Sequence, residues 1–290
     1  MPNLHHGRPS LVWITGAAGL IGNYLVRTAT QIAAAWRVRP LTRSDLDLTD
    51  CQKVEVLFRQ EQPTAIFHCA ALSKSPDCQS NPALARKLNI EVTQQLCELA
   101  RDIPFIFFSS DLVFDGSTGN YDETSPVNPL SVYAETKVAA EQIVLSNPRH
   151  IVIRTSLNGG ISPSGDRGFN EQLRNAWGAG ETLRLFTDEF RCPIHAEVTA
   201  RAAWELLAKN QPGFFHVAGS ERLSRWQIGQ LLAPRWPQLN PKMAATSLKE
   251  YQGAPRAPDT SLNCAKAQKL LSFQIPGLSA WLTAHPNESF

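Results

Sequence analysis

The feature that most constrains the fold is a glycine-rich turn directly after a short apolar segment. Residues 11–15 read Leu-Val-Trp-Ile-Thr, and glycines then recur at every third position, Gly16, Gly19 and Gly22. Gly16 permits a tight turn, Gly19 lets the backbone approach a ligand, and Gly22 lets the helix pack closely on the sheet. The order of strand, turn and helix predicts a dinucleotide site with the diphosphate at the helix N-terminus, the alternative being glycines that serve packing alone.

The rest of the first half repeats a unit of short strand and helix. Apolar runs lie at residues 37–41, 64–69, 104–109 and 150–154, and segments with helical spacing lie at residues 20–35, 51–60, 82–100 and 133–145. Short, almost continuous apolar strands between helices are typical of a parallel sheet covered on both faces. The sequence therefore predicts an α/β fold with a Rossmann-type doubly wound parallel sheet.

The second half is less regular. It has helical spacing at residues 169–178 and 197–209, a strand-like run at residues 213–217 and a proline-rich tail. We expect residues 1–155 to form mainly the NAD(P)-binding domain. Residues 156–290 are then mainly a smaller C-terminal α/β substrate lobe, with some segments returning to the first domain. The loops at residues 115–129 and 158–168 are long enough to act as lids.

Composition excludes several classes of protein. The chain has 28 Lys and Arg against 26 Asp and Glu, which argues against a nucleic-acid partner because phosphate neutralisation needs clustered excess cations. No apolar run approaches the roughly 18 residues of a membrane helix, and the first ten residues lack the apolar stretch of a signal peptide. A cytoplasmic location is expected. The six cysteines form no C-x-x-C pair, so neither a metal site nor a disulfide framework is expected.

The end of the second predicted strand bears on the choice of cofactor. Residues 41–44 read Leu-Thr-Arg-Ser, without an acid until Asp45. An acid here usually holds the ribose hydroxyls of NAD, whereas an arginine can hold a 2′-phosphate. Arg43 therefore favours NADPH, with NADH possible, unless it is an ordinary solvated arginine. Asp47 can bond the adenine edge or cap the next helix.

A tyrosine and a lysine open the helix predicted at residues 133–145. Tyr133 and Lys137 are four residues apart and so share one helix face. Carbonyl reduction needs a proton as well as a hydride, and a phenol with a pKa of about 10 donates reluctantly near neutrality. We expect the charge of Lys137 to depress the pKa of Tyr133. The loop after the fourth strand adds the hydroxyls of Ser109 and Ser110 at the same sheet edge as the glycine turn.

With these motifs in order, the chain resembles the extended short-chain dehydrogenase/reductase family and, within it, the dTDP-4-dehydrorhamnose reductase-like (RmlD-like) branch. The resemblance covers nearly the whole chain. The matching segments are residues 15–22, 46–50, 69–71, 109–116, 133–137, 154–156, 191–194, 214–220 and 256–262.

The resemblance implies roles for individual residues. Tyr133 is the expected proton donor, Lys137 its partner and ribose ligand, and Ser110 the hydroxyl that steadies the substrate oxygen. Asn89 is expected to support Lys137. The full set expected to bind the cofactor is Gly16, Ala18, Gly19, Leu20, Ile21, Gly22, Arg43, Asp47, Leu48, Cys69, Ala70, Ala71, Asn89, Ser109, Tyr133 and Lys137.

The resemblance also implies that the C-terminal lobe holds a nucleotide sugar. Asp111, Arg191 and Arg256 are the expected substrate-binding residues, since a planar guanidinium suits a diphosphate. An interdomain salt bridge is the alternative role for the two arginines. Leu112 and Leu157 stand where the family often has aromatic residues, so the substrate half of the resemblance is the weaker half.

The leading hypothesis is an NAD(P)H-dependent reductase of a keto group on a nucleotide-linked deoxysugar. One alternative is an NADP-binding regulatory subunit resembling that of methionine adenosyltransferase, although the intact Ser110, Tyr133 and Lys137 speak against it. Another is a nucleotide-sugar epimerase or dehydratase, which Arg43 disfavours. A homodimer through the helices at residues 82–100 and 133–145 is possible, as is a monomer.

Overall fold

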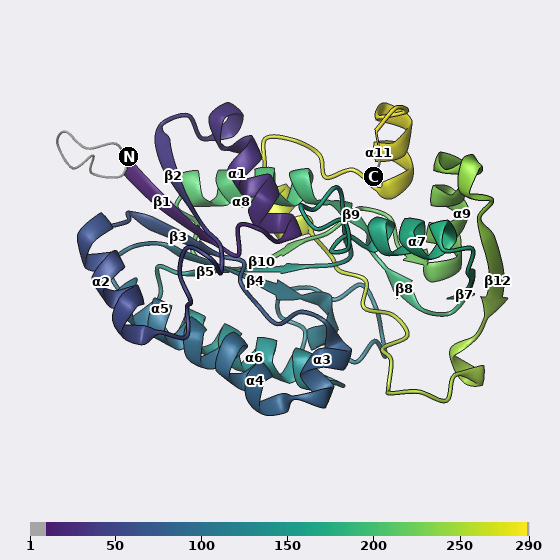
Figure 1. The fold of residues 1–290 in the computed structure, drawn as a ribbon, viewed down its shortest axis with the longest axis horizontal. Helices are drawn as coiled ribbons and strands as arrows, with labels where there is room; N and C mark the ends of the chain where they lie inside the picture. The colour runs from purple at the N-terminus through teal and green to yellow at the C-terminus, as the bar shows by residue number, and fades with distance from the viewer. Residues whose placement is uncertain (1–9, 289) are drawn as a thin grey trace.

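The computed structural model describes residues 10–288 and 290 and is built on one central sheet (Figure 1). Six parallel strands lie in the order β10-β5-β4-β3-β1-β2. This confirms the predicted doubly wound parallel sheet. The strands are β1 (Ser10–Thr15), β2 (Trp36–Leu41), β3 (Ala65–His68), β4 (Phe105–Ser110), β5 (Ile151–Thr155) and β10 (Gly213–Val217).

Helices cover both faces of the sheet because alternate strand residues point to opposite sides. One face packs on α1 (Leu20–Ile32) and α8 (Ala196–Ala208), and the opposite face on α2 (Cys51–Glu61), α5 (Val92–Leu99) and α6 (Val132–Leu145) (Figure 1). Along β1, Val12 and Ile14 enter the first core, whereas Leu11 and Trp13 enter the second. The sheet is therefore buried on both sides.

The segment at residues 82–100 differs from the single helix expected from the sequence. It consists of α4 (Pro82–Arg86), the π-helical turn η1 (Lys87–Glu91) and α5, and a further short helix, α3 (Ser75–Ser80), precedes it. A π turn adds one residue and so shifts the side chains that follow. It lies where Asn89, on η1, is buried and bonded to the loop after β3.

Two segments from the second half of the sequence join this first unit. β10 pairs in parallel with β5 as the edge strand of the sheet, and α8 packs beside α1. Trp204 of α8 contacts Phe67 of β3, with ring centroids 4.7 Å apart. The chain therefore crosses between its two halves more than once.

A smaller lobe lies at the carboxyl end of the sheet (Figure 1). Its helices α7 (Phe169–Gly178), α9 (Arg225–Leu232) and α11 (Leu278–Ala284) surround a separate apolar core that includes Trp177, Trp236 and Trp281. Its strands pair two by two: β6 (Asn158–Gly159) with β9 (Ile194–His195), β7 (Thr182–Phe186) with β12 (Lys242–Thr246), and β8 (Phe190–Arg191) with β11 (Leu223–Ser224).

Short helical turns complete the described chain: η2 (Asp111–Val113), η3 (Ala233–Arg235), η4 (Pro237–Leu239), η5 (Leu248–Glu250) and α10 (Ala265–Gln268). Within residues 10–288 and 290, none of the helices combines the length and the apolar character that crossing a membrane requires.

Candidate active site

A cavity of about 660 Å³ opens at the carboxyl ends of the central strands, between the sheet and the lobe. It lies where the strand order reverses between β1 and β3, the usual ligand position in open α/β sheets. Every residue expected to bind the cofactor lines it except Asn89, and so does Ser110. The structure thus brings together side chains from five strand ends and from α6.

The glycine turn forms one wall of the cavity. Gly16 has a φ of +67°, and a Cβ there would lie 2.6 Å from the amide nitrogen of Ala70. Only glycine suits such a place. Gly19 caps α1 without any side-chain hydrogen bond, so the first amides of the helix remain available to an anion.

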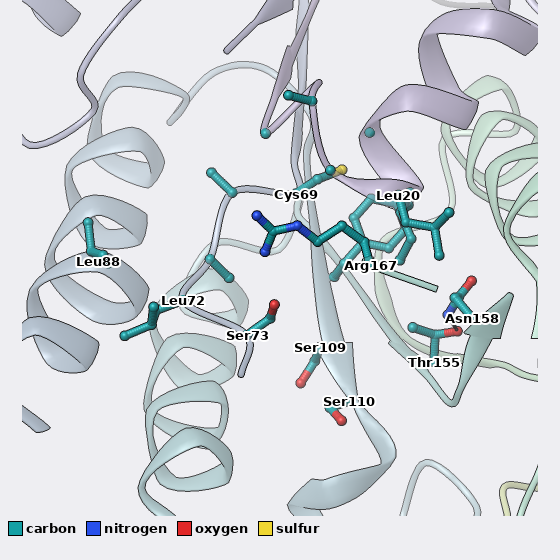
Figure 2. A pocket seen from close by; sticks show the side chains of 18 of the residues that line it. Leu20, Cys69, Leu72, Ser73, Leu88, Ser109, Ser110, Thr155, Asn158 and Arg167 are labelled. Carbon is teal, nitrogen blue, oxygen red and sulfur yellow. Dashed lines mark hydrogen bonds between the residues drawn. The ribbon is translucent and has the colours of Figure 1, made fainter. Parts of the chain in front are cut away.

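Ser109 supplies a second sign that a ligand belongs in the cavity. Its Oγ is the one buried side-chain nitrogen or oxygen of the described residues without a hydrogen-bond partner. Figure 2 shows Ser109 and Ser110 side by side at the cavity wall. An unsatisfied buried hydroxyl costs about 1 to 3 kcal/mol, which a polar ligand can offset. The open amides and this hydroxyl both fit a dinucleotide.

Lys137 lies at the floor of the cavity and is almost fully buried. Its Nζ stands 4.0 Å from the centroid of the Phe107 ring, a cation–π contact. Burial lowers the pKa of Lys137 to about 8, while the carboxylate of Glu141 opposes the shift. Burial and the charge of Lys137 lower the pKa of His68 to about 3. His68 is therefore neutral at pH 7, and its ring nitrogens lie within hydrogen-bond distance of the hydroxyls of Thr15 and Thr93, at 2.8 Å and 3.1 Å.

Tyr133 lies in the first turn of α6, where Ser131 caps the helix by accepting from the amide of Ala134. The sequence-based expectation of a depressed pKa is wrong for this structure. Burial raises the pKa of Tyr133, the carboxylate of Asp111 raises it further, and the hydrogen bond with Ser110 opposes them. The phenol therefore keeps its proton at neutral pH, as a proton donor must.

Asp111 lies behind Ser110 and outside the cavity lining. Ser110 donates to its Oδ1 over 3.2 Å, and its Oδ2 accepts from Ser156 over 2.6 Å and from Thr260 over 3.0 Å. The carboxylate thus joins three distant segments and orients the hydroxyl of Ser110. In this structure Asp111 is placed to position Ser110, and contact with a substrate remains a prediction.

Arg191 and Arg256 do not line the cavity either. Both bind the fully buried Glu189, at 3.2 Å and 2.6 Å, and Arg225 binds the same carboxylate at 3.0 Å. Arg191 also lies 3.8 Å from Asp111. Arg191 and Arg256 thus form the salt bridges that were the expected alternative to diphosphate binding. Of the three arginines around Glu189, only Arg225 lines the cavity.

Glu189 is ionised by its surroundings. Burial alone would raise its pKa, but the guanidinium groups of Arg225, Arg256 and Arg191 lower the pKa to about 2. Three cations thus surround one carboxylate, and one of them, Arg225, lines the cavity.

Asn89 supports the site from below the cavity. Its side chain accepts from the amide of Leu72 over 2.8 Å and donates to the carbonyl of Leu72 and the hydroxyl of Thr136, each over 3.0 Å. Thr136 neighbours Lys137, so Asn89 ties the loop after β3 to α6. Direct contact with a cofactor stays a prediction.

The sequence interpretation missed several residues that line the cavity. They come mainly from the loop after β3 and from the lobe: Leu72, Ser73, Thr155, Ser156, Asn158, Arg167, Phe169, Gln172 and Arg225. Most of them belong to no local motif, because a lobe residue reaches the cavity only through the tertiary fold. The usable signals were the matching segment at residues 154–156 and the length of the loop at residues 158–168. In the described part of the chain, no three His, Cys, Asp or Glu side chains are grouped to hold a metal ion.

A doubly wound sheet with a glycine turn at its switch point and a Tyr-x-x-x-Lys helix beside it defines the short-chain dehydrogenase/reductase class. The RmlD substrate binding domain family matches residues 10–286. The chain therefore belongs to the RmlD family, which confirms the resemblance seen in the sequence.

Two reductases are among the similar sequences. The probable low-salt glycan biosynthesis reductase Agl14 of Haloferax volcanii is 31% identical over 75% of this chain and 77% of its own. The dTDP-4-keto-6-deoxy-D-glucose reductase of Streptomyces niveus is 30% identical over 75% of this chain and 76% of its own. Methionine adenosyltransferase 2 subunit beta of Xenopus laevis is 26% identical over 89% and 81%.

Solved structures share the whole fold. A hypothetical dTDP-4-dehydrorhamnose reductase of Sulfolobus tokodaii has a TM-score of 0.81 at 29% identity, over 92% of this chain and 97% of that one. The dTDP-4-dehydrorhamnose reductase of Bacillus anthracis, solved in complex with NADP, has a TM-score of 0.85 at 21% identity, over 96% and 98%.

Proposed function

We propose that the protein is an NADPH-dependent reductase of the keto group of a nucleotide-linked deoxysugar. The observation that carries the proposal is the single cavity that joins the glycine turn, Ser110, Tyr133 and Lys137. The relative from Streptomyces niveus is named for the same kind of reaction. Membership of the RmlD family adds support over nearly the whole chain.

The residues around the cavity divide the work of a carbonyl reduction. Bound NADPH supplies the hydride for the keto carbon. Tyr133 donates the proton to the keto oxygen, which completes the alcohol, and Ser110 orients that oxygen. Lys137, whose pKa is about 8, is largely protonated at pH 7. Its ammonium stabilises the phenolate that forms as Tyr133 loses its proton.

The dinucleotide is proposed to lie along the glycine turn, with its diphosphate at the N-terminus of α1 and Ser109 bonding it from β4. Arg43 lines the same cavity and supports NADPH through the 2′-phosphate, with NADH possible. The Bacillus anthracis reductase of the same fold was solved with NADP.

Turnover is the direct test. The purified protein is mixed with NADPH and a nucleotide-linked 4-keto-6-deoxy sugar, and loss of NADPH absorbance and formation of the sugar alcohol are measured. We expect oxidation in step with product. Tight NADPH binding without turnover of any keto sugar would contradict the reductase and favour a binding role.

A regulatory subunit is the second candidate. Relatives named methionine adenosyltransferase 2 subunit beta match most of the chain, and Leu157 in the cavity lining departs from the aromatic residue common in the reductases. The retained Ser110, Tyr133 and Lys137 argue for catalysis. A stable complex with a methionine adenosyltransferase, measured by size-exclusion chromatography, would support this candidate.

The assembly and surroundings of the protein belong to the same proposal. We infer a small-molecule substrate of the nucleotide-sugar class, no nucleic-acid partner and a cytoplasmic location. A homodimer through α4, α5 and α6 is a prediction that light scattering can test.

A further inference from the structure

The residues that line the cavity carry an excess of positive charge, although the chain as a whole is nearly neutral. Among its lining residues, Arg43, Lys137, Arg167 and Arg225 stand against one carboxylate, Asp47. Lys137 serves the chemistry, Arg43 the proposed 2′-phosphate, and Arg225 already binds Glu189. Arg167 has no assigned role.

Arg167 reaches into the cavity from the lobe. In the view of Figure 2 its side chain extends across the cavity toward the loop that carries Cys69, Leu72 and Ser73. Its Nε contacts Ser164 over 3.3 Å and Asp166 over 3.2 Å. Within the described chain its Nη1 and Nη2 make no hydrogen bond or ion pair. The two terminal nitrogens are thus free to bind an anion.

The loop that carries Arg167 is firmly held. The buried carboxylate of Glu171 accepts from the amide and hydroxyl of Ser162 over 2.8 Å and 2.6 Å, and from the amides of Arg167 and Gly168 over 2.9 Å and 2.8 Å. Charge-assisted hydrogen bonds of this kind are stronger than neutral ones. The backbone position of Arg167 is therefore set before any ligand binds.

The same loop touches the opposite wall of the cavity. Asp166 pairs with Lys74 over 3.4 Å, and Lys74 directly follows Leu72 and Ser73, which line the cavity. Both partners are about half exposed, so the pair contributes little energy. It nevertheless shows that the loop reaches the segment after β3 on the other side of the cavity.

We propose that Arg167 binds the diphosphate of the dinucleotide from the lobe side, opposite the amides at the N-terminus of α1. The inference rests on the proposed function, because it requires a bound dinucleotide. A planar guanidinium with two free nitrogens suits bidentate phosphate contact. Asp166, the neighbour of Arg167, pairs with Lys74 of the loop after β3. The same loop carries Cys69, Ala70 and Ala71 of the proposed cofactor-binding set, which favours the cofactor over the substrate as the source of the diphosphate.

The test compares ligands that have and lack the bridging diphosphate. Equilibrium dissociation constants are measured for NADPH, for adenosine 2′,5′-bisphosphate and for thymidine diphosphate, with wild type, Arg167→Gln and Arg167→Lys. We expect Arg167→Gln to weaken NADPH by about tenfold and the adenosine bisphosphate by less than about twofold, with Arg167→Lys between. Arg174→Gln, on α7 and outside the cavity lining, is the matched control and should change neither.

Several results would overturn the inference. NADPH affinity equal in Arg167→Gln and wild type would refute it, and weaker binding of thymidine diphosphate alone would assign Arg167 to the substrate instead. Thermal unfolding should be unchanged in Arg167→Gln, because the side chain's own bonds are at the surface; a large drop would mean a structural role. Failure of the wild type to bind NADPH would defeat the proposed function itself, which separates the two failures.

Discussion

Both regions have an apolar core, but the strands of the sheet and the loops of the lobe are fixed by different interactions. In the sheet, β3 and β5 are buried along their whole length, so backbone ladders and apolar side chains on both faces stabilise them. In the lobe, β6, β8, β9 and β11 have two residues each. There, buried carboxylates fix the loops, Glu189 among three arginines and Glu171 among four donors.

This contrast suggests a division of labour. Apolar packing spreads its stabilisation over many residues, whereas a buried polar network depends on each member. The cofactor side should therefore be a rigid platform and the lobe an adaptable cover whose fit depends on a few charges. Substitutions in the two regions test this difference.

Tyr133→Phe should give the largest effect. Loss of the proton donor is expected to lower kcat by about a thousandfold, the range of general acid catalysis, while NADPH affinity stays within about twofold because the phenyl ring still fills its place. Steady-state kinetics and NADPH titration measure the two. Tyr251→Phe, at an exposed site in the lobe, is the control. Unchanged turnover in Tyr133→Phe would remove the tyrosine from the chemistry.

Glu189→Gln should damage the lobe more than the sheet. It leaves Arg225 and Arg256 without a counter-charge and Arg191 with Asp111 alone, which is expected to cost about 3 kcal/mol of stability in urea at pH 7. Exposed Glu181→Gln is the control. NADPH affinity should change less than substrate affinity. Equal losses of both would contradict the division between the two regions.

The same carboxylate predicts a pH dependence. The pKa of Glu189 is about 2 in the folded protein, below its ordinary value of 4.5. Its contribution to the free energy of unfolding is therefore complete above the ordinary value and is lost as pH falls through the folded value. Urea unfolding of wild type and Glu189→Gln from pH 7 to pH 3 should show the two curves approaching each other at the acid end. A constant difference would mean that the charge of Glu189 is not what stabilises the lobe.

Gly16→Ala tests the glycine turn, and Gly180→Ala, in the lobe, is its matched control. Both glycines have positive φ, but a Cβ at Gly16 meets the backbone of Ala70, whereas at Gly180 nothing lies within 4 Å. Gly180→Ala should cost about 1 kcal/mol from backbone strain alone, and Gly16→Ala about 2 kcal/mol together with loss of NADPH binding. Equal effects on stability would show that the close approach to Ala70 does not matter.

Arg43→Gln should have the smallest effect. It is expected to weaken NADPH by about tenfold and to leave NADH unchanged, because only the former carries the 2′-phosphate. Parallel titrations with the two cofactors provide the control within one variant. Equal weakening of both would assign Arg43 to another part of the dinucleotide.

The sequence predicted the sheet better than the lobe because the signals of the sheet are local. Apolar runs, a glycine turn and a Tyr-x-x-x-Lys pair each lie within a few residues, so the strands of the sheet followed from them, and with the family resemblance so did about half of the cavity lining. The π turn at Lys87–Glu91 and the short lobe strands did not follow, since neither has a clear period.

What the chain determined by itself was the order of its elements and the residue types that meet the strand ends. The tertiary structure decided that β10 returns to the sheet edge, that Arg191 and Arg256 turn to Glu189, and that Arg167 crosses the cavity. It also decided the sign of the pKa shift at Tyr133, through burial and Asp111. These outcomes depend on the exclusion of solvent and on contacts between residues that are far apart in the sequence, such as the hydrogen bond from Thr260 to Asp111. A sequence pattern does not show which distant residues meet in space.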